Sequence, residues 1–395
     1  MSTIPKLALI PSGVKANKVY SVLPADGVGD FDFSRSGSAT RINKDGLIEM
    51  VDADVPRLNY PIIDGVVSGC PSLLLEPART NLLQYSEDFS QSYWNKASST
   101  VTLTSEISPN GTTDSVYNLT GTSANLYVGG TTGVEHTISF YIKSNGQGKD
   151  KFKLRLGNNT SIEYTATNEW VRYEYTETPT TSVFGITTAS APNNEFDLLI
   201  WGAQVEAGSY PTSYIPSLSN SQTTRSAETC NNSGDANTFN DSEGVLMLEA
   251  VGFDSGVSSS IYIGDGGTSN RMQIVFHSSG EIRSFITGVN GGNTTVFSSG
   301  ILNYDSFHKV VISYSSSAFE FWIDGFKIDF NNSDYSFNSG ELTELNFDVN
   351  GSENFYGNTK QIQYFDTALN DTDLETLTSW TSFNEMAEGQ LYTIQ

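Results

Sequence analysis

The residues of this chain that could do recognisable chemistry are aromatic. Trp and Tyr rings stack on the apolar faces of sugars, and four positions are candidates for such contacts: Tyr127, Trp170, Trp201 and Trp322. The three tryptophans lie in strand-like sequence, where packing in a core is the competing interpretation. For Tyr127 the sequence does not choose the side of the sheet. The aromatic residues therefore predict sugar binding as one use and core packing as the other.

Two oxygen-rich stretches are candidates for a calcium loop. Residues 264–270 contain Asp265, and residues 329–334 contain Asp329 and Asp334. Carboxylates and carbonyls in loops suit Ca²⁺, although neither stretch has the spacing of an EF-hand. Turn formation accounts for the same residue types. Both interpretations, calcium binding and turn chemistry, remain open from the sequence.

Other residue types offer little for catalysis. The three histidines, His136, His277 and His308, lack the spaced partners of a metal triad. No local phrase marks out a pair of carboxylates for hydrolysis, and no glycine motif for phosphate or dinucleotide binding occurs. We therefore expect no catalytic residues and a protein that is not an enzyme.

Composition and charge narrow the class of protein. The chain has 395 residues, of which 37% are hydrophobic and 17% charged, and its net charge is −24. Residues 226–395 carry 23 acids against 5 bases, which makes nucleic acid and anionic membranes poor partners. The N-terminus lacks the charged start and following apolar run that are typical of a signal peptide. No segment approaches the roughly 20 apolar residues of a membrane span. We expect neither nucleic-acid binding nor membrane insertion.

Strand patterns predict a mostly β protein, since many short alternating segments are separated by Gly, Asn and Ser turns. In Lys151–Leu156 the apolar and basic residues alternate strictly, which predicts a half-buried antiparallel strand. Residues 39–49 and 319–328 predict hairpins that turn at Asp-Gly pairs. Near the end, 361–377 predicts a strand followed by a short helix capped by Asn370.

The stretch from Phe31 to Leu83 carries three phrases: Phe33–Glu49 (FSRSGSATRINKDGLIE), Asp54–Tyr60 (DVPRLNY) and Leu73–Leu83 (LLLEPARTNLL). Together they resemble a module of tailed-phage virion proteins, in which a short β-rich collar precedes jelly-roll and lectin-like domains. That resemblance implies an assembly or adhesion part of a virus particle.

Two later regions carry further resemblances. Residues 137–144, Trp170-Val-Arg-Tyr and Trp201–Pro216 (WGAQVEAGSYPTSYIP) look like carbohydrate-binding-module jelly rolls. The strand order from residue 244 onward resembles laminin-G or concanavalin-A-like sandwiches. The implied fold is all-β, with tandem antiparallel β-sandwiches (a jelly roll, then a concanavalin-A-like sandwich) and a small N-terminal β collar. The expected parts are a β-rich connector (1–80), the jelly roll (81–216), a linker (217–242), the second sandwich (243–382) and a C-terminal tail (383–395).

From these resemblances we expect a structural component of a bacteriophage virion, such as a tail-fibre, baseplate or head-surface protein, with lectin-like domains that bind host surface glycans. The expected partners are other virion proteins and further copies of the chain, for instance in a trimer. We expect the protein to be made in the host cytoplasm and released by lysis. A glycan-degrading depolymerase and a decoration protein without ligand are the alternatives.

Overall fold

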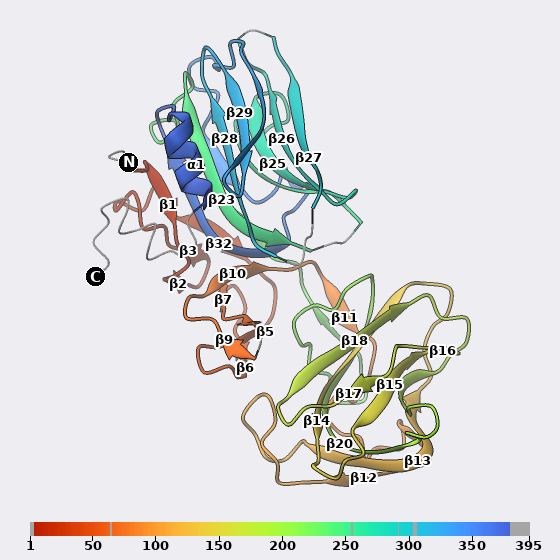
Figure 1. Ribbon diagram of the computed structural model, residues 1–395. Helices are drawn as coiled ribbons and strands as arrows, with labels where there is room; N and C mark the ends of the chain where they lie inside the picture. The colour runs from red at the N-terminus through yellow and green to blue at the C-terminus, as the bar shows by residue number, and fades with distance from the viewer. Residues whose placement is uncertain (1–3, 64, 254–255, 291, 303–305, 380–395) are drawn as a thin grey trace. The chain divides into compact units, whose positions relative to one another are not determined.

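The computed structural model describes the whole chain except residues 1–3, 64, 254–255, 291, 303–305 and 380–395. Antiparallel strands dominate, and α1 (Asp371–Ser379) is the one helix among the described residues (Figure 1). The expected all-β fold is therefore confirmed. The expected tail, 383–395, lies outside the described residues. In the described part of the chain, no helix combines the length and apolar character needed to cross a membrane.

The chain folds into two compact units, each built from separated segments. Unit 1 contains residues 1–36, 53–77 and 227–395, and unit 2 contains residues 37–52 and 78–226. The chain therefore passes between the units four times. This division differs from the expected boundaries, which followed the order of the sequence.

Unit 1 is built on two antiparallel sheets. The first has the order β30-β29-β28-β23-β32-β10-β7, with β1 also paired to β32. Its strands are β1 (Leu7–Leu9), β7 (Arg57–Asn59), β10 (Ser72–Leu75), β23 (Gly244–Gly252), β28 (His308–Tyr314), β29 (Phe319–Ile323), β30 (Phe326–Asn331) and β32 (Gly357–Phe365). The second has the order β27-β26-β25-β24-β31. Its strands are β24 (Ser259–Gly264), β25 (Arg271–His277), β26 (Glu281–Thr287), β27 (Thr295–Ile301) and β31 (Glu344–Asn346).

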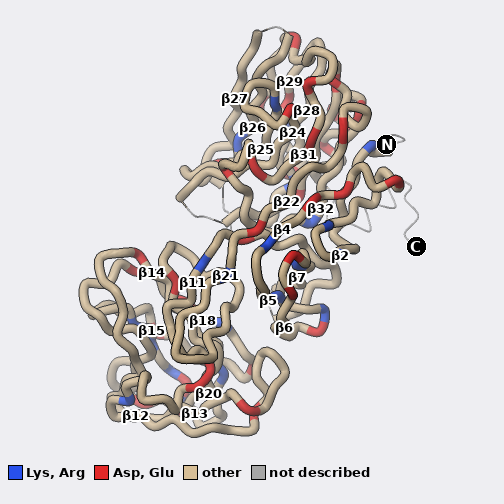
Figure 2. The backbone as a smooth tube through the Cα atoms, turned by 180° about the vertical axis from the view of Figure 1, so that it is seen from behind, with Lys and Arg blue, Asp and Glu red and all other residues tan. Residues whose placement is uncertain are grey.

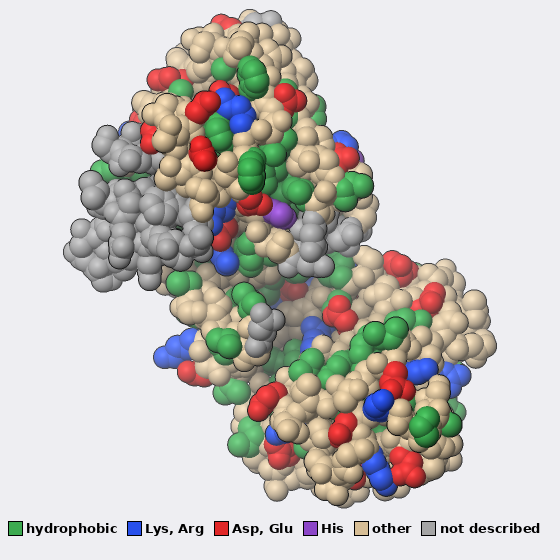
Figure 3. Space-filling view, in the orientation of Figure 1, with side chains coloured by type: hydrophobic (Ala, Val, Ile, Leu, Met, Phe, Trp, Pro, Cys, Tyr) green, Lys and Arg blue, Asp and Glu red, His purple; other side chains and the backbone are tan. Residues whose placement is uncertain are grey.

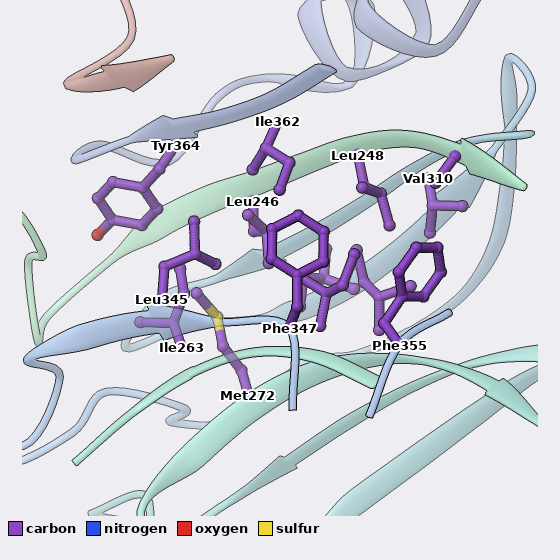
Figure 4. Packing of buried hydrophobic residues seen from close by; sticks show 14 of the residues in the cluster. Leu246, Leu248, Ile263, Met272, Val310, Leu345, Phe347, Phe355, Ile362 and Tyr364 are labelled. Carbon is purple, nitrogen blue, oxygen red and sulfur yellow. The ribbon is translucent and has the colours of Figure 1, made fainter. Parts of the chain in front are cut away.

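The core of unit 1 lies between these two sheets. Figure 4 shows Leu246, Leu248 and Ile362 of the first sheet facing Ile263 and Met272 of the second, and all five are fully buried. Because side chains alternate between the faces of a strand, every second residue of β23 enters this core. The arrangement is a β-sandwich.

The helix α1 covers the other face of the first sheet. Leu374 and Leu377 of α1 are buried against Met247 of β23, so that β23 is covered on both sides. The backbone amide of Asp373 donates to Asn370 Oδ1 at 3.0 Å. The predicted cap at Asn370 is thereby confirmed, because a side-chain oxygen accepts one of the first free amides of the helix.

Unit 2 is dominated by a nine-stranded antiparallel sheet with the order β16-β15-β19-β13-β20-β14-β18. In addition, β12 pairs with β13 and β17 pairs with β15. Its strands are β12 (Asn95–Leu103), β13 (Tyr117–Val128), β14 (His136–Ser144), β15 (Lys151–Leu156), β16 (Asn159–Thr160), β17 (Tyr164–Thr165), β18 (Val171–Glu177), β19 (Phe184–Thr188) and β20 (Glu195–Ala207). The ring centroids of Phe152 in β15 and Tyr173 in β18 lie 5.0 Å apart, although these strands stand near opposite ends of the order. The sheet therefore curls around its own core.

Both predicted Asp-Gly hairpins form. β5 (Ala39–Ile42) pairs with β6 (Ile48–Val51), and β29 pairs with β30. The remaining short strands form three small sheets. They are β2 (Val14–Lys15), β3 (Lys18–Val19), β4 (Phe31–Ser34) and β22 (Thr229–Asn231) in one sheet, β11 (Arg79–Asn81) with β21 (Thr223–Arg225), and β8 (Ile62–Ile63) with β9 (Val66–Val67).

Two stretches differ from their expected roles. Residues 1–80 form no separate collar, because β1, β7 and β10 extend the first sheet of unit 1. Residues 217–242, expected as a linker, supply β21 and β22 and bury Cys230 and Phe239 in the core of unit 1. Short strands satisfy their backbone groups by pairing with longer strands, and here those partners are distant in sequence.

Candidate functional site

Of the predicted sugar-binding tryptophans, Trp201 is fully buried. Its ring lies 4.7 Å from the ring of Tyr214, and its Nε1 donates to Ser115 Oγ at 3.0 Å. A sugar needs an accessible ring face, and Trp201 presents none. The structure therefore corrects the prediction for Trp201, which is a core residue of unit 2.

Trp322 is also a packing residue. It is 5% exposed and belongs to the apolar cluster beneath α1. The Nζ of Lys327 lies 5.1 Å from the centroid of its ring. Since the helix and this lysine cover the ring, the prediction that Trp322 contacts a glycan is corrected as well.

Trp170 is half-buried and lies directly before β18. Its Nε1 donates to the carbonyl of Ile107 at 2.8 Å, and its ring packs against the cluster around Trp201 and Tyr214. One part of the ring is therefore engaged in packing while another remains accessible. The structure brings Trp170 and Trp201 together but does not bring Tyr127 to them.

Tyr127 is the predicted aromatic residue that lies on an outer sheet face. Its neighbours in β13, Leu126 and Val128, are buried in the core of unit 2, so the half-buried Tyr127 side chain points to the opposite face. Gly185 of β19 is directly opposite Tyr127, and Arg155 of β15 is directly opposite Gly185. The structure thus makes the choice of side that the sequence left open.

Gly185 has a structural reason to be glycine. A Cβ at this position would lie 2.0 Å from the carbonyl oxygen of Leu126, which is far below any allowed contact. The two strands can approach this closely only because the side chain is absent. As a result, β19 places no side chain directly opposite Tyr127.

A second row of polar residues accompanies Tyr127 on the same face. Lys153, Thr187 and Asn125 are paired across β15, β19 and β13. We call this surface the Tyr127 face and define it by Asn95, Asn125, Tyr127, Lys153, Arg155, Gly185 and Thr187. The members apart from Gly185 are half-buried or exposed. The Tyr127 face thus combines one aromatic ring with amides, a hydroxyl and two cations.

The two cations of the Tyr127 face have only uncharged partners among the described residues. Arg155 donates through Nε to the carbonyl of Gly157 at 2.7 Å and through Nη1 to Asn125 Oδ1 at 3.3 Å. Lys153 Nζ donates to Ser190 Oγ at 3.3 Å. By contrast, Lys149 and Lys151 nearby form ion pairs with Glu195 and Glu163.

The predicted calcium residues serve as turn acceptors. Asp265 accepts from the amides of Gly267 and Asn270, at 2.8 and 3.0 Å. Hydrogen bonds from the hydroxyl and the backbone amide of Ser336 hold the pKa of Asp334 below its usual value.

Asp329 accepts from the amide of Phe330 at 2.8 Å and is exposed. The structure does not bring Asp265, Asp329 and Asp334 together. Across the described residues, no three His, Cys, Asp or Glu side chains are placed to hold one metal ion, and Figure 2 shows the acidic residues spread over separate strands and loops.

The opening phrases supply three of four charged side chains that meet inside unit 1. Arg35, Arg57, Glu76 and Glu228 form this buried charge cluster, and their side chains are 0–2% exposed. Arg57 Nη1 lies 2.7 Å from Glu76 Oε2, and Arg35 Nη1 lies 2.7 Å from Glu228 Oε1. Two positive and two negative charges balance, so the cluster is neutral. No pattern in the sequence pointed to Glu228, which lies in the expected linker.

Arg57 of the buried charge cluster is held in its charged form. Burial alone would lower the pKa of Arg57, but the carboxylates of Glu228 and Glu76 outweigh burial and raise that pKa above its ordinary value. The backbone amide of Glu76 also donates to Glu228 Oε2 at 2.9 Å. All these charges are used internally, so their effect is to join four separate segments of unit 1.

The phrase Trp201–Pro216 forms an equivalent polar core in unit 2. Glu206 is fully buried and accepts from Gln204 Nε2 at 2.6 Å and from the amide of Thr212 at 2.9 Å. Thr212 Oγ1 in turn accepts from Arg225 Nη1 at 3.0 Å. The polar residues of this phrase therefore hold the backbone in place.

Asn81, the asparagine of the phrase Leu73–Leu83, completes this core. Its Nδ2 donates to the carbonyls of Ala203 and Ile215 at 3.2 and 2.9 Å. Its Oδ1 accepts from the amides of Leu83 and Val205 at 3.1 and 3.2 Å. A single buried amide thereby fixes three segments of unit 2, and the phrase that it belongs to is architectural.

Comparison with known proteins gives no match to a family model and none to a curated protein. Among solved structures, a carbohydrate-binding module (CBM40) of the Ruminococcus gnavus IT-sialidase, bound to α2,3-sialyllactose, is similar at 13% identity and a TM-score of 0.31, covering 35% of this chain and 83% of that one. Domain 4 of AbnA, a GH43 extracellular arabinanase from Geobacillus stearothermophilus in complex with arabinotriose, is similar at 10% identity and a TM-score of 0.32, covering 39% and 73%. The chain is thus an all-β protein with a distant structural match to carbohydrate-binding β-sandwich domains.

Proposed function

We propose that this chain is a non-catalytic structural protein of a tailed-phage particle whose unit 2 binds host surface glycans through the Tyr127 face. The observation that carries the binding role is the outward Tyr127 ring beside Gly185, with polar side chains on either side. Sugar rings stack on such aromatic faces, and their hydroxyls bond to amides and charged groups. Figure 3 shows charged side chains of both signs scattered over the visible surface of unit 2.

The register of the strands places polar groups around the Tyr127 ring. A ring seated on Tyr127 would have Asn95 on one neighbouring strand and Arg155 beyond Gly185 on the other. Asn125 lies two residues from Tyr127 on the same face and offers both a donor and an acceptor. The stacking face and the polar groups are all carried by strands, which hold them in fixed positions.

A glycan array with the full chain and two variants tests the binding role. Tyr127→Ala removes the stacking ring, and Tyr60→Ala removes a half-buried tyrosine of unit 1 as the matched control. We expect the wild-type chain and Tyr60→Ala to bind the same glycans, and Tyr127→Ala to lose at least tenfold in affinity, about 1.4 kcal/mol. Binding that survives in Tyr127→Ala would show that the site lies elsewhere.

The virion role rests on the resemblance of the opening phrases to a module of tailed-phage virion proteins. The internal use of charged residues from the opening phrases supports an architectural task, since Arg35, Arg57 and Glu76 all form buried ion pairs. On this proposal the partners are other virion proteins and further copies of the chain. The protein leaves the host cytoplasm by lysis.

Purified particles test the virion role directly. A labelled chain should be detected in virions by electron microscopy and by mass spectrometry of washed particles. Its absence from such particles would overturn the virion role. Reducing ends released from host capsule or wall glycans would instead identify a depolymerase, and a protein found on particles that binds no glycan would be a decoration protein.

A further inference from the structure

The charge of the Tyr127 face differs from that of the chain as a whole. The chain has a net charge of −24, yet this face carries Lys153 and Arg155 and no acidic residue. Both cations lie on the outer side of β15, because Phe152, Leu154 and Leu156 of that strand are buried. Residues two apart on a strand are about 7 Å from each other. The face therefore presents two neighbouring positive charges beside an aromatic ring.

The local carboxylates do not neutralise these charges. Lys151, on the same strand, is paired with Glu163 at 2.8 Å, and Lys149 is paired with Glu195 at 2.6 Å. Lys153 and Arg155 have a hydroxyl, a carbonyl and an amide as neighbours instead. Within the described residues of β15, Lys151 is thus paired with an acidic residue, whereas Lys153 and Arg155 are not.

The hydrogen bonds of Arg155 leave its outer edge available. Nε is used by the carbonyl of Gly157, and one Nη1 hydrogen is directed to Asn125 Oδ1. A guanidinium has five N–H donors, so the two hydrogens of Nη2 and the second hydrogen of Nη1 have no partner among the described residues. That edge matches the spacing of the two oxygens of a carboxylate, which arginine binds through paired hydrogen bonds.

We propose that the Tyr127 face selects acidic glycans, namely sugars that carry a carboxylate, with Arg155 and Lys153 binding the carboxylate and Tyr127 stacking on the sugar ring. This inference rests on the proposed glycan-binding function and adds the class of ligand. The negative net charge of the chain would repel polyanions at long range, so the two cations must act at short range. Salt screens charge pairs, so the contribution of Lys153 and Arg155 to the affinity for an acidic glycan should be greatest at low salt and decline as salt is raised.

The test pairs acidic oligosaccharides with neutral counterparts of the same shape. Oligosaccharides that contain glucuronate, galacturonate or sialate are immobilised beside the same compounds after reduction of the carboxyl group to a primary alcohol. The full chain is compared with Lys153→Gln, Arg155→Gln, Tyr127→Ala and the control Lys151→Gln, and thermal unfolding checks that each variant is folded. Lys153→Gln serves as the independent variant should Arg155→Gln fail to fold.

We expect the wild-type chain to prefer an acidic ligand over its reduced form, and each of Lys153→Gln and Arg155→Gln to weaken binding to the acidic ligand about tenfold. Lys151→Gln should leave binding unchanged. If the wild-type chain binds acidic and reduced ligands equally, and Tyr127→Ala loses this binding, the acidic selectivity is overturned. The glycan-binding function would still stand. If Lys151→Gln weakens binding as much as Lys153→Gln does, the preference for acidic ligands comes from general charge attraction, and the proposed selectivity of this face is overturned. No binding to any member of the panel or of the glycan array would overturn both.

Discussion

Arg57 and Glu228 are 171 residues apart in the sequence and lie face to face inside unit 1, with Arg57 Nε 2.9 Å from Glu228 Oε1. A second contact joins Arg57 Nη2 to Glu228 Oε2, so the guanidinium and the carboxylate meet as two parallel forks. This paired geometry also orients Glu76 and Arg35 around them. Arg35, Arg57 and Glu76 of the opening phrases thus form buried ion pairs that stabilise the fold.

Removing one member of this pair should destabilise unit 1 strongly. Glu228→Gln leaves Arg57 and Arg35 with one carboxylate between them in a buried site, and we expect the free energy of unfolding to fall by about 3–5 kcal/mol. Urea denaturation at neutral pH measures the change. The half-buried pair Arg41–Glu49 supplies the control, since its side chains are 25% and 36% exposed and Glu49→Gln should cost less than about 1 kcal/mol. Equal effects in the two variants would contradict the buried role of Glu228.

The amide of Asn81 should be equally sensitive in unit 2. Asn81→Asp keeps the shape but replaces two donors by an oxygen that faces the carbonyls of Ala203 and Ile215. We expect a loss of about 3 kcal/mol in the free energy of unfolding. Asn158→Asp, at an exposed turn, should stay within about 0.5 kcal/mol of the wild type. A small effect at Asn81 would show that the amide is not a structural anchor.

Asp88 predicts a pH dependence for unit 2. Burial acts to raise the pKa of Asp88, but hydrogen bonds from Ser90, Gln91 and Tyr117 outweigh burial and lower the pKa below its usual value. A carboxyl whose pKa is lowered in the folded state stabilises the fold above its unfolded pKa of about 3.9. That stabilisation is lost as the pH falls through the folded pKa.

Asp88→Asn should therefore lower the free energy of unfolding by about 1 kcal/mol at pH 7, a modest value because the carboxylate is partly exposed. The gap between variant and wild type should narrow below about pH 4, where the unfolded wild-type chain takes up a proton at Asp88 while the folded chain still holds the carboxylate ionised. Urea denaturation at pH 7, 4 and 3 measures the difference in the free energy of unfolding between variant and wild type. Asp114→Asn, at an exposed position, is the control. A gap that is the same at all three pH values would count against this account.

Trp201 and Tyr127 should separate stability from binding. Trp201→Phe removes buried ring volume and the hydrogen bond to Ser115 Oγ, so we expect a loss of about 2 kcal/mol in stability and unchanged glycan binding. Tyr127→Ala should change stability by less than about 1 kcal/mol and weaken glycan binding at least tenfold. Thermal unfolding and the glycan array, run on the same preparations, measure both quantities. Loss of binding in folded Trp201→Phe would restore Trp201 as a ligand residue.

The sequence alone determined those features that depend on neighbouring residues. The alternation in Lys151–Leu156, the Asp-Gly turn at Asp324 and the cap at Asn370 were each predicted and each formed, because strand faces, tight turns and helix starts depend on local backbone chemistry. The all-β fold follows from the same local rules repeated along the chain.

Only the tertiary structure decided where distant segments meet. Nothing near Glu228 indicates Arg57 as its partner, and nothing near Trp201 shows that its ring lies inside the core while Tyr127 faces outward. A strand has two faces, and which one becomes buried depends on the sheet that packs against it. For that reason the sequence identified aromatic residues as candidates, whereas the pairing of β13, β19 and β15 placed Tyr127, Lys153 and Arg155 on one face.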